Sequence, residues 1–73
     1  MEAGRYANFL KVGYTEYEFL LDFGQSFGQE DPRVHTRIVT TPTHAKALSR
    51  TLRESVEQFE ARYGPIADIE PES

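Results

Sequence analysis

Few side chains in this sequence could take part in a reaction. The 73 residues contain no cysteine, which excludes disulfides and thiolate metal sites, and only two histidines, His35 and His44. Two imidazoles are too few for a structural zinc site without added carboxylates, so we expect no metal. The serines have no base nearby in the sequence, and the acidic pair Glu30–Asp31 falls in a turn-rich stretch where carboxylates are usually solvated. We therefore predict that the chain is not an enzyme and holds no cofactor.

The basic residues are concentrated in one part of an otherwise acidic chain. The net charge is −4, yet no acidic residue occurs from Pro32 to Arg53. Such a cluster could bind an anion such as a nucleic-acid phosphate, with a helix start and nearby aromatic rings contributing. The candidate residues are Arg33, Arg37, His44, Lys46, Arg50 and Arg53. Because the overall charge is negative, nucleic-acid binding is the alternative rather than the leading hypothesis.

Hydrophobic periodicity predicts the elements that would position these residues. Residues 6–24 (YANFLKVGYTEYEFLLDFG) contain two strand-like segments with a turn near Gly13, and residues 33–41 alternate again. The stretch between, GQSFGQEDP, is a loop. If the second and third strands pair antiparallel, one register sets Glu18 beside Arg37 and Asp22 beside Arg33. Each such cross-strand pair contributes about 0.2–1 kcal/mol.

A single long helix follows the third strand. Thr41 is a suitable N-cap, Pro42 suits the first helical position, and Gly64 with Pro65 ends the helix. The helix carries a narrow apolar stripe at spacings of three and four: Ala45, Leu48, Leu52, Val56, Phe59 and Tyr63. We predict an α+β fold, a three-stranded antiparallel meander followed by one C-terminal helix (βββα). The single domain spans residues 6–66, between a flexible N-terminus (1–5) and a flexible acidic tail (67–73).

The charges along this helix run against its dipole. Its first half carries Lys46, Arg50 and Arg53, and its second half carries Glu54, Glu57 and Glu60, whereas a helix dipole favours the reverse. One explanation is intrahelical pairing, Arg50 with Glu54 and Arg53 with Glu57, worth about 0.2–0.5 kcal/mol each. The other is an antiparallel helix of a second chain, in which Arg50 faces Glu57 of the partner and Lys46 lies near its Glu60. A half-basic, half-acidic helix complements itself in that orientation.

The small size of the chain also favours a homodimer. A domain of this length buries little surface and usually needs a disulfide, a metal or a partner chain. One helix can cover one face of the sheet, which leaves apolar residues on the other face, including Leu20 and Val39 with either Phe9 or the pair Leu10 and Val12. We predict that the dimer interface draws on Leu48, Leu52, Val56, Phe59, Leu20 and Val39.

Function can be narrowed only to two hypotheses. The first is a small, non-catalytic, homodimeric interaction or adaptor module with a protein partner, which would present sheet edges and the loop around Phe27. The alternative that the sequence leaves open is a Phe27 side chain packed against the edge of the core. The second is a nucleic-acid-associated dimer that uses the basic surface at the helix start. No apolar run approaches the roughly 20 residues of a membrane span, and MEAGRY lacks a signal-peptide core. We therefore expect a soluble cytoplasmic protein.

Three motifs carry a resemblance to a known family. They are an aromatic-x-Asn start at Tyr6 and Asn8, an E-F-x-L-D-F strand at residues 18–23, and the sequence RIVTTPTHAK at residues 37–46. In these the chain resembles the small prokaryotic proteins catalogued as domain of unknown function 3467, over about Tyr6 to Ile66. The resemblance implies no activity. It implies a recurring constellation, either structural or ligand-binding, of Asn8, Asp22, Arg37, Pro42 and His44.

Overall fold

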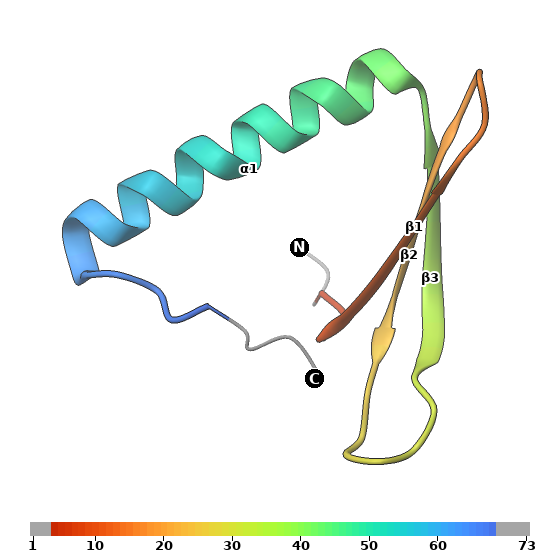
Figure 1. Cartoon of the computed structure of the whole chain (residues 1–73), viewed down its shortest axis with the longest axis horizontal. Helices are drawn as coiled ribbons and strands as arrows, with labels where there is room; N and C mark the ends of the chain where they lie inside the picture. The colour runs from red at the N-terminus through yellow and green to blue at the C-terminus, as the bar shows by residue number, and fades with distance from the viewer. Residues whose placement is uncertain (1–3, 69–73) are drawn as a thin grey trace.

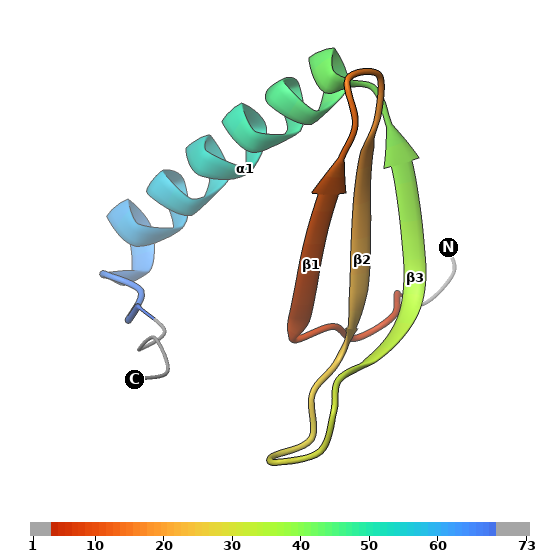
Figure 2. The ribbon, with the colours of Figure 1, turned by 45° about the vertical axis from the view of Figure 1, so that its right-hand side comes forward.

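The computed structural model describes residues 4–68 and has the predicted order of elements. Strands β1 (Phe9–Tyr14), β2 (Phe19–Gln25) and β3 (Arg33–Thr40) form an antiparallel meander, and helix α1 (Pro42–Tyr63) follows at once (Figure 1). β2 lies between the other two strands (Figure 2). The predicted βββα fold is therefore confirmed. Residues 1–3 and 69–73 of the predicted flexible ends lie outside the described part of the chain.

The pairing of the strands gives the sheet one apolar face and one face of mixed apolar and charged residues. Leu21 at the centre of β2 lies opposite Val12 of β1 and Ile38 of β3, so these three side chains share one face. Leu10 and Phe23 extend that face at one end, and Tyr14 and Phe19 extend it at the other. The opposite face carries Phe9, Lys11, Leu20, Asp22, Arg37 and Val39. Phe9, rather than Leu10 and Val12, therefore accompanies Leu20 and Val39.

The predicted register between β2 and β3 was wrong. The structure pairs Asp22 with Arg37, and Arg33 lies opposite Gln25. Glu18 is not in a strand but in the turn before β2, where its N–H donates to Thr15 Oγ1 over 3.1 Å. The predicted register would set residues 38–40 opposite the β1–β2 turn and leave their backbone groups without a strand partner. The observed register pairs β2 over its full length and aligns Leu21 with Ile38.

The β1–β2 turn depends on Thr15 and not on Gly13. Gly13 lies within β1, and the residues with positive φ in the described chain are Gly28 and Gly64. The backbone N–H of Thr15 donates to the Glu18 carbonyl over 2.9 Å, and the Thr15 hydroxyl accepts from Tyr17 and Glu18 N–H groups at 3.1 Å each. A threonine side chain thus caps the turn from within.

A β-bulge distorts the other hairpin beside Gly24. Phe23 pairs with Thr36 and Gly24 with Val34, so His35 is an extra residue on β3. At Gly24 the two backbones approach so closely that a Cβ would lie 2.1 Å from the Arg33 carbonyl oxygen. The loop beyond turns at Phe27–Glu30, where Glu30 N–H donates to Phe27 O over 3.1 Å and Gly28 has φ of 62°. Only glycine can occupy position 24 without moving β3.

The helix ends follow the predicted capping residues. Thr41 Oγ1 accepts from His44 N–H over 3.1 Å, Pro42 occupies the first turn, and Gly64, with φ of 102°, donates its N–H to Glu60 O over 2.9 Å. The Glu60 carboxylate also accepts from Ile66 N–H over 2.8 Å, which holds the chain beyond the helix. The start and end of α1 are therefore fixed by local hydrogen bonds.

The helix does not cover the sheet, contrary to the expectation that it would shield one face. The main contacts between elements join β1 with β2 and β2 with β3, and α1 makes no comparable contact with a strand. It leaves the end of β3 and runs away from the sheet (Figures 1 and 2). The radius of gyration of the Cα atoms is 14.5 Å, whereas a compact chain of this length has about 11 Å. The fold is open rather than compact.

Candidate interaction surface

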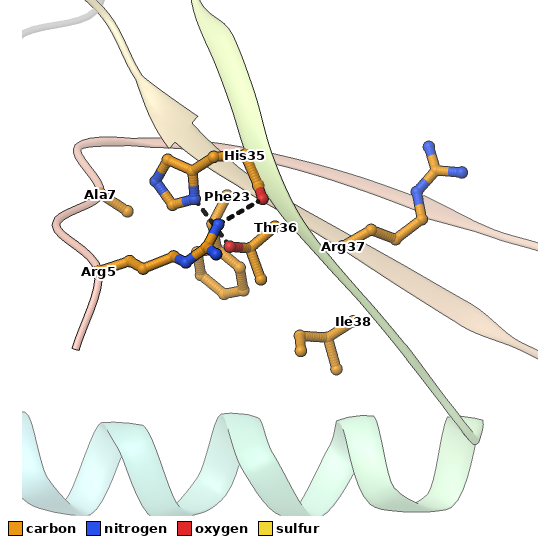
Figure 3. Close-up of a pocket in the computed structure, with 7 residues that line it drawn as sticks. All are labelled: Arg5, Ala7, Phe23, His35, Thr36, Arg37 and Ile38. Atoms are coloured by element: carbon orange, nitrogen blue, oxygen red, sulfur yellow. Dashed lines mark hydrogen bonds between the residues drawn. The ribbon is translucent and has the colours of Figure 1, made fainter. Parts of the chain in front are cut away.

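The first component of the candidate site is the apolar face of the sheet. It is defined by Leu10, Val12, Tyr14, Phe19, Leu21, Phe23 and Ile38, with Thr36 and Thr40 at its margin. Leu21, 9% exposed, is the only buried hydrophobic residue in the described chain. Leu10, Val12, Tyr14 and Ile38 are exposed although they point to the same side as Leu21. Figure 3 shows Ile38 and Phe23 on the side of the sheet toward α1. This surface, the apolar sheet face, is largely open to solvent.

The second component is the apolar stripe of α1, which is equally uncovered. No residue of α1 is buried. Leu52, at the middle of the helix, is 60% exposed, and Phe59 is 48% exposed. Leu48, Val56 and Tyr63 are exposed as well, and the Phe59 and Tyr63 rings pack against each other, with centroids 4.9 Å apart. The helix stripe, defined as Ala45, Leu48, Leu52, Val56, Phe59 and Tyr63, therefore has no partner within the described chain.

The opposite face of the sheet is more polar than predicted. Leu20 is half-buried and Val39 is exposed, but Asp22 and Arg37 lie between them and Phe9. The Arg37 guanidinium donates two hydrogen bonds to the Asp22 carboxylate, Nε to Oδ1 over 2.7 Å and Nη2 to Oδ2 over 2.9 Å. This bidentate pair neutralises one of the predicted anion-binding arginines. We expected the uncovered apolar residues on this face because we assumed that α1 would cover the other face of the sheet.

The Asp22–Arg37 ion pair should make the stability of the fold depend on pH. Hydrogen bonds from Arg37 lower the pKa of Asp22 below its ordinary value of 3.8, the charges of Arg37 and Lys11 lower it further, and partial burial opposes them. Since the folded pKa lies below the unfolded one, the pair stabilises the fold above pH 4 and loses this effect as the pH falls through the folded pKa. In an NMR titration of the side-chain carboxyl carbon, we expect a lower Asp22 midpoint in the wild type than in Arg37→Gln.

The same prediction can be checked by unfolding. The stability difference between the wild type and Asp22→Asn, measured in urea, should shrink as the pH is lowered from 7 toward 2. Lys11→Gln is the matched control, because it removes the weaker neighbouring charge and keeps both hydrogen bonds. Equal Asp22 midpoints in the wild type and Arg37→Gln would contradict the assignment.

The N-terminal segment is held against β3 by a network that the sequence did not reveal. Arg5 Nη1 donates to the His35 carbonyl over 3.0 Å, and His35 Nε2 lies 2.9 Å from the Tyr6 carbonyl. A carbonyl oxygen only accepts, so Nε2 carries a proton and donates to it. Nδ1 lies 2.7 Å from the Thr36 hydroxyl oxygen, within hydrogen-bond distance. His35 is thus a structural residue of the bulge. A periodicity argument could not find this contact, because the extra residue of a bulge breaks the period.

A wide, shallow hollow of about 680 Å³ lies beside this network. It is lined by Arg5, Ala7, Phe23, His35, Thr36, Arg37 and Ile38. Figure 3 shows Phe23, His35, Thr36 and Arg5 gathered on the side toward α1, whereas the Arg37 side chain points away. The hollow is a part of the apolar sheet face where the N-terminal segment raises one rim. No carboxylate lines the hollow, so it suits an apolar side chain better than the substrate of a reaction.

The predicted basic cluster is divided between two places. Arg33 and Arg37 lie on β3, where Arg37 is paired with Asp22. Lys46, Arg50 and Arg53 lie together on one flank of α1 and, with Ser49, line a small hollow of about 190 Å³. His44 is exposed in the first turn of α1, and its backbone N–H binds the Thr41 cap. The structure therefore keeps a three-residue basic flank and not a six-residue cluster.

The recurring constellation is largely structural. The Asn8 side chain accepts from Ser26 N–H over 2.7 Å and donates to Ser26 O over 3.3 Å, so it extends the ladder beyond β1. Asp22 and Arg37 pair across strands, and Pro42 begins α1. These contacts explain four of the five residues without a ligand. Phe27, 52% exposed at the tip of the β2–β3 loop, is partly available to a partner.

Two further kinds of site have no counterpart in residues 4–68. No group of three or more His, Asp or Glu side chains could hold a metal ion there. No helix in that range is long and apolar enough to span a bilayer.

The fold and its open surfaces define a class: a small βββα protein whose sheet and helix each present an uncovered apolar surface. The chain belongs to the family described as protein of unknown function (DUF3467), whose model matches residues 1–68. The resemblance inferred from the three motifs is thereby confirmed. No curated protein and no solved structure matches the chain.

Proposed function

We propose that this protein is a non-catalytic homodimeric interaction module. The observation that carries the proposal is the pair of uncovered apolar surfaces, the apolar sheet face and the helix stripe, in a chain whose described part buries one hydrophobic side chain. Apolar surfaces of this extent mark contacts with another protein. A second copy is the partner that is always present with the first, and closed two-fold dimers are the commonest assemblies.

The exposed area fits a permanent dimer. The accessible surface is 6997 Å², whereas a folded monomer of 8.4 kDa exposes about 4,600 Å². Assigning the eight residues outside the described range the area of a fully extended chain, about 1,300 Å², still leaves an excess of about 1,100 Å² per chain. A dimer that removed this excess would bury about 2,200 Å² or more in total, within the range of obligate homodimers.

The charges of α1 favour an antiparallel arrangement of the two helices. Arg50 of one chain would face Glu57 of its partner, and Lys46 would lie near Glu60 of its partner, about a centre between Arg53 and Glu54. Both partners of each such pair lie on the same flank of the helix stripe, since residues 46, 50, 53, 57 and 60 fall within about 80° of one another at 100° per residue. The two-fold axis brings the two flanks together, so that the basic residues of each chain lie opposite the acidic residues of the other.

The dimer leaves other surfaces for an outside protein. The outer edges of β1 and β3 have no strand partner among the described residues, so a partner chain can add a strand there. The β2–β3 loop lies at the end of the sheet opposite the start of α1 (Figure 2), and Phe27 in this loop is exposed. We assign these edges and this loop to recognition of a protein partner, and the protein would then act as an adaptor without catalysis.

One observation favours the second candidate, a nucleic-acid-associated dimer. Lys46, Arg50 and Arg53 share a flank of α1, where they and Ser49 surround a hollow that could receive a phosphate. In the antiparallel dimer the same side chains face glutamates of the partner, so the two functions compete for them. Retention of DNA or RNA that falls steeply with salt would favour the nucleic-acid function.

A charge exchange on α1 tests the antiparallel pairing of the two helices. Changing Lys46, Arg50 and Arg53 to Glu should weaken the dimer about tenfold in Kd, from lost pairs and like-charge repulsion near the interface. Adding Glu54→Lys, Glu57→Lys and Glu60→Lys should restore it, because the sixfold variant has the same complementarity with the signs exchanged. Sedimentation equilibrium of both variants gives the two Kd values. A sixfold variant that dimerises no better than the threefold one would contradict pairing through α1.

A further inference from the structure

The connection between β3 and α1 is a single residue, Thr41. Its backbone is extended, with φ of −82° and ψ of 157°, its hydroxyl caps the helix, and its carbonyl accepts from Ala45 N–H over 2.9 Å. Pro42 fixes its own φ and restricts Thr41 to extended conformations. Helices that pack on their own sheet usually follow a connection of 2–6 residues. The junction is therefore too short and too stiff to fold α1 back over the sheet that precedes it.

This junction explains why two matching surfaces of one chain do not meet. The helix stripe and the apolar sheet face are both exposed, and α1 diverges from the sheet along its whole length (Figure 1). Each surface is of the kind that the other would bury. When a short hinge prevents closure within a chain, the same contact forms between chains.

We propose that α1 of each chain covers the apolar sheet face of the other chain. The inference rests on the proposed homodimer and adds which surfaces of the two copies meet. The partner helix would lie on the apolar sheet face, beside the chain's own α1 and antiparallel to it. Two identical contacts of this kind, related by a two-fold axis, complete both folds.

The dimensions of the two surfaces agree. An α-helix of 22 residues is about 33 Å long and about 10 Å across. A strand of eight residues spans about 26 Å, and three strands at their usual spacing make a sheet about 14 Å wide. One helix therefore covers one face of this sheet along its length. The shallow hollow between Phe23, Thr36 and Ile38 lies within the covered area and would receive a large side chain of the helix stripe.

The charges also agree with this arrangement. With the helix stripe turned toward the sheet of the partner, the flank that carries Lys46, Arg50 and Arg53 points sideways, along the sheet. The neighbour on that side is the α1 of the partner, which runs in the opposite direction. The glutamates in the second half of the partner helix then lie beside the basic residues in the first half of this one. A single orientation of α1 therefore buries its apolar stripe and pairs its charged residues.

A cross-linking experiment tests the exchange of helices directly, because the chain has no cysteine of its own. A ¹⁵N-labelled Ile38→Cys chain is mixed with an unlabelled Leu52→Cys chain, unfolded, refolded and treated with a short bismaleimide. No link between positions 38 and 52 can form within a chain of this mixture. We expect a covalent product of one labelled and one unlabelled chain joined through these positions, identified by peptide mass mapping.

The controls separate failure of this inference from failure of the dimer. Val56→Cys serves as a second helix probe, so that the test does not depend on one register. Gln58→Cys, about 120° around α1 from Leu52 and outside the stripe, should give no link to position 38. Circular dichroism confirms that each variant is folded. A dimer by sedimentation in which neither helix probe links to Ile38→Cys would overturn the exchange and leave the dimer standing. A folded monomer would overturn both.

Discussion

Leu52→Asp is expected to abolish the dimer. The variant places a carboxylate at the centre of the helix stripe, and in a two-fold dimer the change occurs twice. Burying an unpaired charge in place of a leucine costs at least about 2 kcal/mol at each site, so Kd should rise at least about a thousandfold. Because Leu52 is 60% exposed in a single chain, the same change should cost little in a protein that is a monomer. Sedimentation velocity over a range of concentrations measures the loss.

The matched control is Gln58→Asp, which adds the same charge to the other side of the same helix. It should leave the dimer within about twofold in Kd, because a surface substitution usually changes stability by less than about 0.5 kcal/mol. Far-UV circular dichroism adds a second readout. Leu52→Asp should lose helical signal together with the dimer, since an isolated helix of this length is marginal in water. A Leu52→Asp variant that keeps its dimer would contradict burial of the helix stripe.

Gly24→Ala is expected to destabilise the fold by about 3 kcal/mol or more. The added Cβ would lie 2.1 Å from the Arg33 carbonyl oxygen and 2.9 Å from the Val34 Cα. Both are backbone atoms of the neighbouring strand, so relief requires β3 to shift at the bulge. That shift would disturb the pairing of Phe23 with Thr36 and the contacts of His35 with the N-terminal segment. Urea unfolding followed by circular dichroism measures the effect.

Gly13→Ala is the control for this prediction. Gly13 lies in β1 without a positive φ, and a Cβ there meets no atom within 4 Å. The substitution should be neutral or slightly stabilising, because alanine loses less conformational entropy than glycine on folding. Similar stabilities of Gly24→Ala and Gly13→Ala would contradict the close approach of β2 and β3.

The helix could be predicted closely because its signals are local. Thr41, Pro42 and Gly64 act through hydrogen bonds and backbone angles within a few residues of themselves, and the sequence shows them directly. The alternation of Phe19, Leu21 and Phe23 likewise assigned one face of β2 correctly. The family resemblance depended on the same short motifs, and the family model confirms it.

The register of the second hairpin could not be predicted from charge patterns. Asp22 could pair with Arg33 in one register and with Arg37 in another. The two registers differ by four residues, an even number, so both keep every side chain on the same face of the sheet. The loop length and the bulge at His35 decide between them, and neither has a periodic signature. The contact of Asn8 with Ser26 was hidden for a similar reason, since it joins a side chain to the backbone of a distant loop.

The departure of α1 from the sheet was also missed, although its cause is visible in the sequence. The alternating segment, residues 33–41, runs directly into Pro42, and so short a connection could have signalled a helix that cannot return to its own sheet. The prediction counted apolar residues on each face and did not consider the geometry of the connection. It therefore assigned the uncovered surface to Leu20 and Val39, whereas the larger one includes Leu10, Val12 and Ile38.

The central claim is that one copy of this chain cannot shield its own apolar surfaces and that a second copy does so. Sedimentation equilibrium of the unmodified protein from nanomolar to micromolar concentration tests it most directly. We predict a single species of twice the 8.4 kDa chain mass, with secondary structure lost wherever dilution separates the chains. A monomer that stays fully folded and unfolds cooperatively at micromolar concentration would contradict it.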